Sequence, residues 1–158
     1  MSLARFHQAQ SNEWSGYATA LAEMRRGHKS SHWIWYVFPQ IEGLGRSFTA
    51  REYALRDLSE ACDYLRDTVL REQYEEIAGV VDEQLANGVQ AETLMGGSID
   101  AQKLASSLTL FRAAAGQLTS TDPTLTSLAR RCDSILQKLQ SQGYPPCEFT
   151  SSKVQTGA

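Results

Sequence analysis

Long apolar segments are missing from this chain of 158 residues, and their absence limits where the protein can act. No run approaches the about 18 apolar residues of a membrane-spanning helix. The stretch from Met1 to Gln10 also lacks the apolar core of a secretory signal. We therefore expect a protein without a membrane partner, located in the cytoplasm.

Cysteine is scarce as well, and its spacing excludes two common roles. Cys62, Cys132 and Cys147 are an odd and widely spaced set, unlike a disulfide framework or the Cys-x-x-Cys pairs of a zinc site. We expect free thiols, of which at least two pack as small apolar groups. His28 and His32 have the spacing of helical zinc ligands, but the glutamate of a His-Glu-x-x-His motif is absent. We predict no metal site, and no motif implies a cofactor.

The composition is that of one ordinary globular domain, but its charges are unevenly distributed. Hydrophobic residues make up 42% of the chain and charged residues 21%, which excludes a disordered chain. The net charge of −3 argues against a nucleic-acid binder with a basic surface. Basic residues dominate from Arg25 to Arg51, whereas acids dominate from Glu60 to Glu92. The acidic segment is typical of solvated helix faces, and it is also a candidate surface for a protein partner.

Apolar residues recur at helical spacing along most of the chain. The strongest pattern runs from Leu70 to Leu85 and ends at Asn87-Gly88. The apolar run Trp33–Phe38 is interpreted as a buried helical turn, because no second strand-like run is present to pair with it. The predicted helices cover residues 13–27, 48–56, 59–65, 70–85, 100–116 and 123–139, with N-terminal caps at Asn12, Ser47, Ser59 and Asp122.

These patterns predict an all-α fold without a substantial sheet. We expect one compact domain over residues 1–141, made of six or seven helices joined by short Gly/Ser/Asp loops. Residues 142–158 contain Pro145-Pro146 and show no periodicity, so we expect them to form a loose tail.

Two glycine-containing loops precede predicted helices and carry basic residues. The first contains Gly43, Gly45, Arg46 and Ser47, and the second runs from Gly96 to Lys103. The free N–H groups and the positive dipole end of a helix favour a bound anion. The spacing matches neither a P-loop nor a dinucleotide fingerprint. The loops are therefore either turn formers or two sides of a pocket for a small anion.

The segment from Lys29 to Gly45 concentrates aromatic and polar side chains. Polar groups beside an aromatic wall are typical of ligand pockets, but a well-satisfied core contains them too. The candidate ligand-binding residues of this segment are Lys29, Ser31, Trp33, Trp35 and Gln40. In an enzyme, His32 is the natural general acid or base, because histidine exchanges protons near neutral pH. Asp100 or Glu42 would supply a carboxylate, and Lys29, Arg46 and Lys103 would bind an anion.

A resemblance to a known family rests on several motifs of this chain. They are Ser31-His32-Trp33-Ile34-Trp35, Phe38-Pro39-Gln40, Gly43-Leu44-Gly45, Asp100-Ala101-Gln102-Lys103-Leu104 and Thr109-Leu110-Phe111. With these residues the chain resembles, over about residues 3–130, an uncharacterised bacterial family of helical domains that commonly carries the name calpastatin. The resemblance implies a compact all-helical fold and no established activity.

Three functions are compatible with these observations. The first is a small-ligand domain that binds or hydrolyses an anionic, nucleotide-like molecule, for example of the ADP-ribose type, between residues 29–45 and 96–103. The second is a non-catalytic module that binds a protein partner. The third, nucleic-acid binding by residues 25–51, is disfavoured by the negative net charge. Enzyme and binder both stay open.

Overall fold

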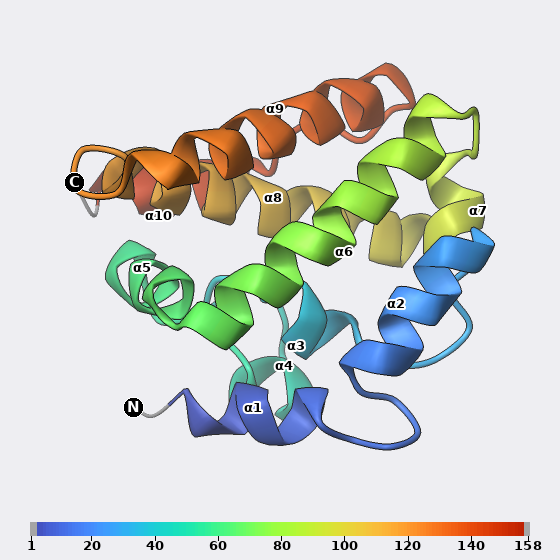
Figure 1. Ribbon diagram of the computed structural model, residues 1–158, viewed down its shortest axis with the longest axis horizontal. Helices are drawn as coiled ribbons and strands as arrows, with labels where there is room; N and C mark the ends of the chain where they lie inside the picture. Colours follow the sequence, from blue (N-terminus) through green and yellow to red (C-terminus); the bar gives the residue numbers. More distant parts are fainter. Residues whose placement is uncertain (1–2, 157–158) are drawn as a thin grey trace.

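The computed structural model describes residues 3–156, which form ten α-helices and one 3₁₀ turn, η1 (Figure 1). In chain order the elements are α1 (Ala4–Gln10), α2 (Tyr17–Arg26), α3 (Ile34–Val37), α4 (Phe48–Glu52), α5 (Leu58–Arg66), α6 (Thr68–Ala86), α7 (Ala91–Met95), α8 (Ser98–Leu118), η1 (Pro123–Leu125), α9 (Thr126–Ser141) and α10 (Glu148–Thr156). Residues 1–2 and 157–158, at the outer ends of the predicted domain and tail, lie outside the described residues.

Helix α8 is the element around which the others pack. Every residue from Leu104 to Phe111 is buried, so this helix needs neighbours on all sides. Helix α9 runs beside it, and α5, α7 and α10 also lie against it (Figure 1). Helix α6 crosses the front of the view and connects α9 to α2 through its contacts with both. Although α8 is long, neither it nor another helix within residues 3–156 combines the length and apolar character needed to cross a membrane.

The all-α prediction is confirmed, whereas the predicted number of six or seven helices is wrong. Within residues 3–156 the β pairing is limited to a single parallel bridge between Ile41 and Leu55. The extra helices are short or polar. Helix α7 has five residues, too few to show a repeat, and α10 consists mostly of polar residues, so neither has a clear apolar period.

Side-chain caps explain where several helices begin. Ser47 accepts a hydrogen bond from the Ala50 amide and Asp122 accepts one from the Thr124 amide, as the two predicted caps require. The predicted cap at Ser59 is wrong, because Asp57 accepts from the Glu60 amide and so starts α5 earlier.

The first long helix begins later than the sequence predicts. The predicted helix cap at Asn12 is wrong, because its Oδ1 accepts from the amides of Trp14 and Ser15 and closes a turn outside the helix, while Gly16 is the N-cap of α2. Helix α2 starts only at Tyr17. Trp14 therefore does not lie on the buried helix face and is 80% exposed.

Residues after Gln142, expected to be a loose tail, contain helix α10. Thr150 is fully buried, and its hydroxyl lies 3.1 Å from the hydroxyl of Ser106 on α8. The Cys147 amide donates to the Thr109 hydroxyl at 3.1 Å, one turn further along α8. Buried hydroxyl pairs, which leave no apolar period in the sequence, thus attach this helix to the core.

A chain of aromatic rings joins the segment after α2 to the core. Phe38 contacts Tyr74 with ring centroids 5.5 Å apart, and Tyr74 contacts Phe111 at 4.4 Å. Tyr64 lies 5.2 Å from Phe111 and also 5.2 Å from Phe6. Such edge-to-face and tilted pairs are favourable beyond their burial. They fix the end of α3 against α5, α6 and α8, which positions the site described below.

Two of the three cysteines pack as apolar groups, as predicted. Cys62 and Cys132 are buried, and all three thiols are free. Burial raises the pKa of Cys132 to about 12, so its thiol stays protonated at neutral pH.

The docking of α10 is testable by removing its buried hydroxyl. Thr150→Val leaves the Ser106 hydroxyl without this partner, and we expect the free energy of unfolding to fall by about 1–2 kcal/mol. Urea unfolding followed by circular dichroism measures the change. Gln155→Ala, an exposed substitution in the same helix, is the control and should leave the midpoint unchanged. Equal stability of Thr150→Val and the wild type would contradict the docking.

Candidate functional site

A cleft of about 320 Å³ opens where the segment after α2 meets the start of α4 and the first turn of α8. Its lining residues are Lys29, His32, Ile34, Trp35, Tyr36, Ser47, Thr49, Asp100 and Lys103. Residues 29–45 and 96–103 thus meet around a cleft, as the sequence predicts. The roles assigned to their side chains remain predictions.

Backbone contacts hold the two walls of the cleft together. The Lys29 amide donates to the Leu94 carbonyl at 2.8 Å, and the Gln40 side-chain amide donates to the Lys103 carbonyl at 2.8 Å. Gly96, in the left-handed conformation, approaches the Lys29 carbonyl so closely that a Cβ would lie 2.8 Å from that oxygen. The spacing between the walls is therefore fixed by the backbone.

The carboxylate of Asp100 bridges the two lysines of the cleft. Its Oδ2 lies 2.8 Å from Lys29 Nζ, and its Oδ1 lies 3.5 Å from Lys103 Nζ. Lys29 Nζ also donates to the Ser31 carbonyl at 2.6 Å, and its side chain is only 6% exposed. Two ammonium groups against one carboxylate leave a net positive charge in the cleft.

The Trp35 indole forms an aromatic wall beside these charges. Lys103 Nζ lies 4.4 Å from the ring centroid, a distance typical of a cation–π contact. At the ring edge, a Cβ on Gly45 would lie 2.8 Å from Trp35 Cη2 and 2.6 Å from the Ala50 Cβ. The absence of a side chain at Gly45 thus allows the loop to fix the orientation of the indole.

Three further polar residues of the cleft are exposed. His32, Ser47 and Thr49 all face solvent. Among residues 3–156, none forms a hydrogen bond to the His32 imidazole, whereas the Ser47 hydroxyl accepts from the Ala50 amide. The imidazole is therefore accessible for a hydrogen bond or a proton transfer to a molecule in the cleft.

Glu23, which the sequence analysis missed, organises the segment that forms one wall. It is 2% exposed, and its Oε1 accepts from the Ser30 amide at 2.8 Å, the Ser31 amide at 3.0 Å and Trp33 Nε1 at 2.9 Å. The Ser31 hydroxyl donates to Oε2 at 2.5 Å. A signal existed, because Glu23 shares the buried face of α2 with Ala20 and Met24.

These hydrogen bonds keep the Glu23 carboxylate ionised. Burial is the largest single influence and raises its pKa, but the bonds from the Ser31 side chain, the Ser30 amide and the Trp33 indole together lower it to about 2. The folded protein therefore holds a buried negative charge beside the Lys29 segment at all physiological pH values.

Seven sequence candidates do not line the cleft. Ser31 and Trp33 contact Glu23, and Trp33 is fully buried as a core residue. Gln40 is buried, where it bonds to the Phe38 and Lys103 carbonyls. The remaining four are Glu42, Gly43, Gly45 and Arg46, and Glu42, the alternative carboxylate to Asp100, is exposed outside the cleft.

The two glycines of the first loop serve packing, whereas Ser47 of the same loop lines the cleft, so a role of this loop in anion binding remains a prediction. Gly43 has a φ of +104°, and a Cβ there would lie 2.8 Å from the Phe149 ring of α10. Gly45 makes room for Trp35. Arg46 is exposed, and its carbonyl accepts two hydrogen bonds from the Arg51 guanidinium. The close approach of neighbouring side chains is sufficient to explain why these positions are glycine.

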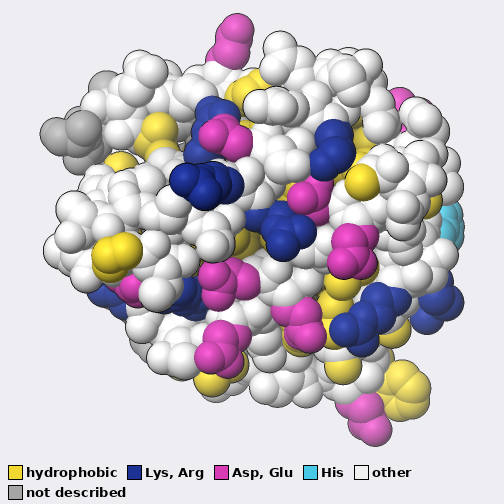
Figure 2. Space-filling view, turned by 45° about the horizontal axis from the view of Figure 1, so that its top comes forward, with side chains coloured by type: hydrophobic (Ala, Val, Ile, Leu, Met, Phe, Trp, Pro, Cys, Tyr) yellow, Lys and Arg dark blue, Asp and Glu magenta, His cyan; other side chains and the backbone are white. Residues whose placement is uncertain are grey.

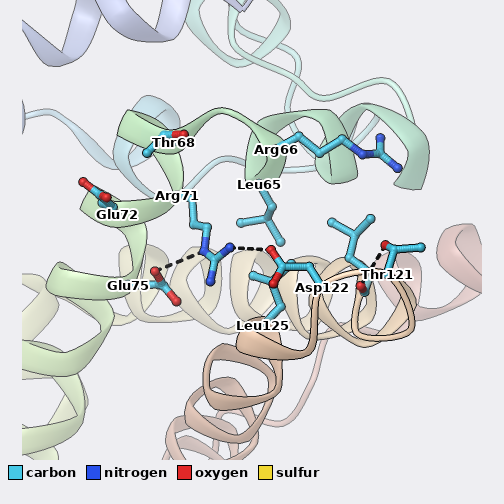
Figure 3. Close-up of a pocket in the computed structure, with 10 residues that line it drawn as sticks. Leu65, Arg66, Thr68, Arg71, Glu72, Glu75, Thr121, Asp122 and Leu125 are labelled. Atoms are coloured by element: carbon cyan, nitrogen blue, oxygen red, sulfur yellow. Dashed lines mark hydrogen bonds and ion pairs between the residues drawn. The ribbon is translucent and has the colours of Figure 1, made fainter.

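A second cleft, of about 360 Å³, lies between the end of α5, α6 and η1 (Figure 3). Arg71 lines it and bonds to Asp122 Oδ2 at 2.8 Å, Glu75 Oε1 at 3.3 Å and the Thr124 hydroxyl at 2.7 Å. The guanidinium therefore joins α6 to the turn before α9, which is a structural role. Within residues 3–156 there is no group of three or more His, Cys, Asp or Glu side chains that could hold a metal ion.

Comparisons with known proteins give a family and a fold but no activity. The model of a family described as "Protein of unknown function (DUF1810)" matches residues 1–134. The crystal structure of a conserved hypothetical protein, Rv1873 from Mycobacterium tuberculosis, is similar with a TM-score of 0.77 and 31% identity, over 97% of this chain and 96% of that one. No curated protein matches. The family description does not contain the name calpastatin.

The role of Glu23 is tested by Glu23→Gln, which removes the charge and some of the acceptor capacity. We expect the free energy of unfolding at pH 7 to fall by about 2–3 kcal/mol, because donors around a buried carboxylate lose their partner. The folded pKa is about 2 and the ordinary value 4.5, so the stabilisation is complete above pH 4.5 and is lost as pH falls toward 2.

Urea unfolding at pH 7, 5 and 2.5 measures both effects. The loss of stability between pH 5 and pH 2.5 should be smaller in Glu23→Gln than in the wild type, while the exposed control Glu13→Gln should keep the wild-type pH dependence. The same acid slope in Glu23→Gln and the wild type would disprove the assignment.

The close approach at Gly45 is tested by adding one methyl group. Gly45→Ala places Cβ against Trp35 and Ala50, and we expect a loss of about 1–3 kcal/mol in the free energy of unfolding. Gly116→Ala is the matched control, because it lies in α8 with no atom within 4 Å and should stabilise the helix slightly. Thermal unfolding compares the two, and a neutral Gly45→Ala would show that the loop is not tightly packed.

Proposed function

Because the chain belongs to the DUF1810 family, whose members are described as proteins of unknown function, we propose a function from the geometry of its cleft. In this proposal the protein binds a small anionic, nucleotide-like molecule in the cleft. The observation that carries this proposal is the combination of Lys29, Lys103 and Asp100 with the Trp35 indole in one cleft. Phosphate-bearing molecules with a planar ring, including those of the ADP-ribose type, match both features.

The net positive charge of the cleft supports the choice of an anion. Lys29 is held by Asp100 and the Ser31 carbonyl, so it contributes a fixed positive field. Lys103 has the longer contact to Asp100 and is 26% exposed, so it is the lysine that can reach a ligand. The exposed hydroxyls of Ser47 and Thr49 and the His32 imidazole add hydrogen-bonding groups at the opposite wall.

Binding is favoured over hydrolysis by the surroundings of Asp100. In a hydrolytic reaction His32 would act as the general acid or base and Asp100 as the second carboxylate. Both oxygens of Asp100, however, are engaged by lysines in the structure, and this arrangement suits positioning of charge better than proton transfer. The cleft is also partly open to solvent, whereas hydrolytic sites commonly exclude water around the reacting groups.

A second candidate function is binding of another protein through exposed aromatic side chains. Trp14 and Phe48 are each 80% exposed, which is unusual for residues of this size. On the face seen in Figure 2, however, hydrophobic side chains form small separate groups between acidic and basic ones. A defined partner that binds the wild type and is lost in both Trp14→Ala and Phe48→Ala would favour this function.

The main proposal is tested by thermal unfolding with a panel of ADP-ribose, NAD, AMP, inorganic phosphate and an uncharged nucleoside. A ligand at about a hundred times its Kd adds about 2.7 kcal/mol, which raises Tm by about 5–11 °C for a domain of this size. We expect such a shift with phosphate-bearing nucleotides. Lys103→Met keeps the aliphatic stem and removes the charge, so it should abolish most of the shift.

Arg130→Ala is the control for charge, because it removes one exposed positive group from α9, outside the cleft. It should keep the wild-type shift. Equal shifts in Lys103→Met and the wild type would place the ligand elsewhere. No shift with any member of the panel would reject the proposal and favour the second candidate.

A further inference from the structure

Resting on the proposed function, we infer that the ligand carries one planar ring joined to one anionic group, and that the ring stacks on Trp35 in place of the Lys103 ammonium, which then pairs with the anionic group. The ligand class is thus a mononucleotide-sized molecule. The cleft holds one such ring and anion unit, and any second ring of a larger ligand stays outside it.

The Trp35 ring is a fixed platform with an occupied face. Its benzo edge abuts Gly45, which sets the plane of the indole. The Lys103 ammonium lies 4.4 Å from the ring centroid and so covers the surface on which a ligand ring would stack. A ring can use this surface only after the ammonium moves away. Ring binding and the position of Lys103 are therefore linked.

Lys103 is free to move and Lys29 is not. The Lys103 ammonium has one carboxylate partner, Asp100, at 3.5 Å, and its side chain is 26% exposed. Lys29 is 6% exposed, lies 2.8 Å from the same carboxylate and bonds to the Ser31 carbonyl. Its ammonium also lies 4.9 Å from the Trp33 ring centroid. When Lys103 moves away, the Asp100 carboxylate is still paired with Lys29. The movement therefore leaves no carboxylate without a counter-charge.

The exchange replaces two weak contacts of Lys103, the cation–π contact with Trp35 and the 3.5 Å ion pair with Asp100, by two stronger ones. A cation–π contact at a partly exposed site is weaker than the stacking of a nucleobase on an aromatic side chain. The released ammonium then meets an anionic group, with which it forms a charge-assisted hydrogen bond. A ring without an anion must displace Lys103 and offers it no new partner. An anion without a ring pairs with Lys103 but offers no stacking. Trp35 then either keeps its contact with the Lys103 ammonium or loses it without a replacement.

The volume of the cleft limits the ligand to one ring. About 320 Å³ is at the lower end of the range of about 300–1,000 Å³ that ligand pockets occupy. The walls cannot separate easily, because the Lys29 amide and the Gln40 side chain connect them through hydrogen bonds. ADP-ribose contains one suitable ring and phosphate unit, and its second sugar would extend into solvent.

Isothermal titration calorimetry of the full chain with AMP, adenosine, ribose 5-phosphate and ADP-ribose tests the inference. We expect AMP to bind at least about tenfold more tightly than adenosine or ribose 5-phosphate. ADP-ribose should bind within about threefold of AMP, because only one of its two halves is held.

The exchange has a signature in the variant Lys103→Met. Removal of the competing charge should strengthen adenosine binding by severalfold, although the same substitution weakens AMP and ribose 5-phosphate. Trp35→Leu should weaken adenosine and AMP and leave ribose 5-phosphate unchanged. Trp35→Phe, a smaller disturbance of the fold, should show the same order with a reduced effect. Arg130→Ala should behave as the wild type.

The outcomes separate this inference from the function on which it rests. Ribose 5-phosphate binding as tightly as AMP, or adenosine binding unchanged or weakened in Lys103→Met, would overturn the exchange while anion binding stands. ADP-ribose binding more than about tenfold tighter than AMP would overturn the limit of one ring. Absence of binding by all four molecules would reject the proposed function together with the inference.

Discussion

A buried negative charge organises the part of the structure on which the site depends. The Glu23 carboxylate accepts two backbone amides, one hydroxyl and one indole N–H from residues 30–33. These bonds hold the chain as it leaves α2, place Trp33 in the core and leave His32 at the surface. Because the carboxylate is so well hydrogen-bonded, its pKa stays at about 2 despite burial. One wall of the cleft thereby has a fixed shape before any ligand arrives.

The other wall is the first turn of α8, and its charge is set by Asp100. Asp100 pairs with Lys29 across the cleft and with Lys103 on its own helix, so the same carboxylate neutralises one lysine firmly and the other loosely. Gly45 and Gly43 allow the connecting loop to lie against Trp35 and Phe149. Preorganised charge next to an oriented aromatic ring is a feature of small-ligand sites. It distinguishes this cleft from the one beside Arg71, whose lining residues within the described part of the chain include no aromatic side chain.

The sequence predicts the parts of this structure that carry strong periodicity or a clear capping residue. The pattern from Leu70 to Leu85 gives α6, and Ser47 and Asp122 are caps in the structure as in the sequence. The predicted meeting of residues 29–45 with residues 96–103 follows from the polar groups set beside aromatic ones in the first of these segments. Helix α10 was not predictable in this way, because a buried hydroxyl pair holds it and no apolar stripe marks its sequence.

Errors within the site have a common physical origin. In the sequence, Glu23 resembles an ordinary solvent-exposed charge on a helix. The structure shows that it accepts a hydrogen bond from the buried Trp33 indole, a contact that depends on the fold. The sequence leaves Gly43 and Gly45 as either turn formers or part of an anion pocket, because glycine near a helix start also suits a phosphate. In the structure they lie outside the cleft lining and make room for neighbouring rings. Lys29 lines the cleft as the sequence predicts, but its ammonium already contacts Asp100 and the Ser31 carbonyl, so its contact with a ligand remains a prediction. Sequence spacing identifies which residues meet, but not which of their atoms remain free.

The most direct measurement of the central claim is a titration of the ¹⁵N-labelled protein with AMP, observed at the indole N–H signals of its three tryptophans. Trp35 lines the cleft, Trp33 is buried with its N–H bonded to Glu23, and Trp14 is exposed outside α2. The account predicts a saturable shift of the Trp35 signal together with the amides of residues 99–103, while the Trp14 and Trp33 signals stay in place. No shift at Trp35, or a shift confined to Trp14, would contradict it.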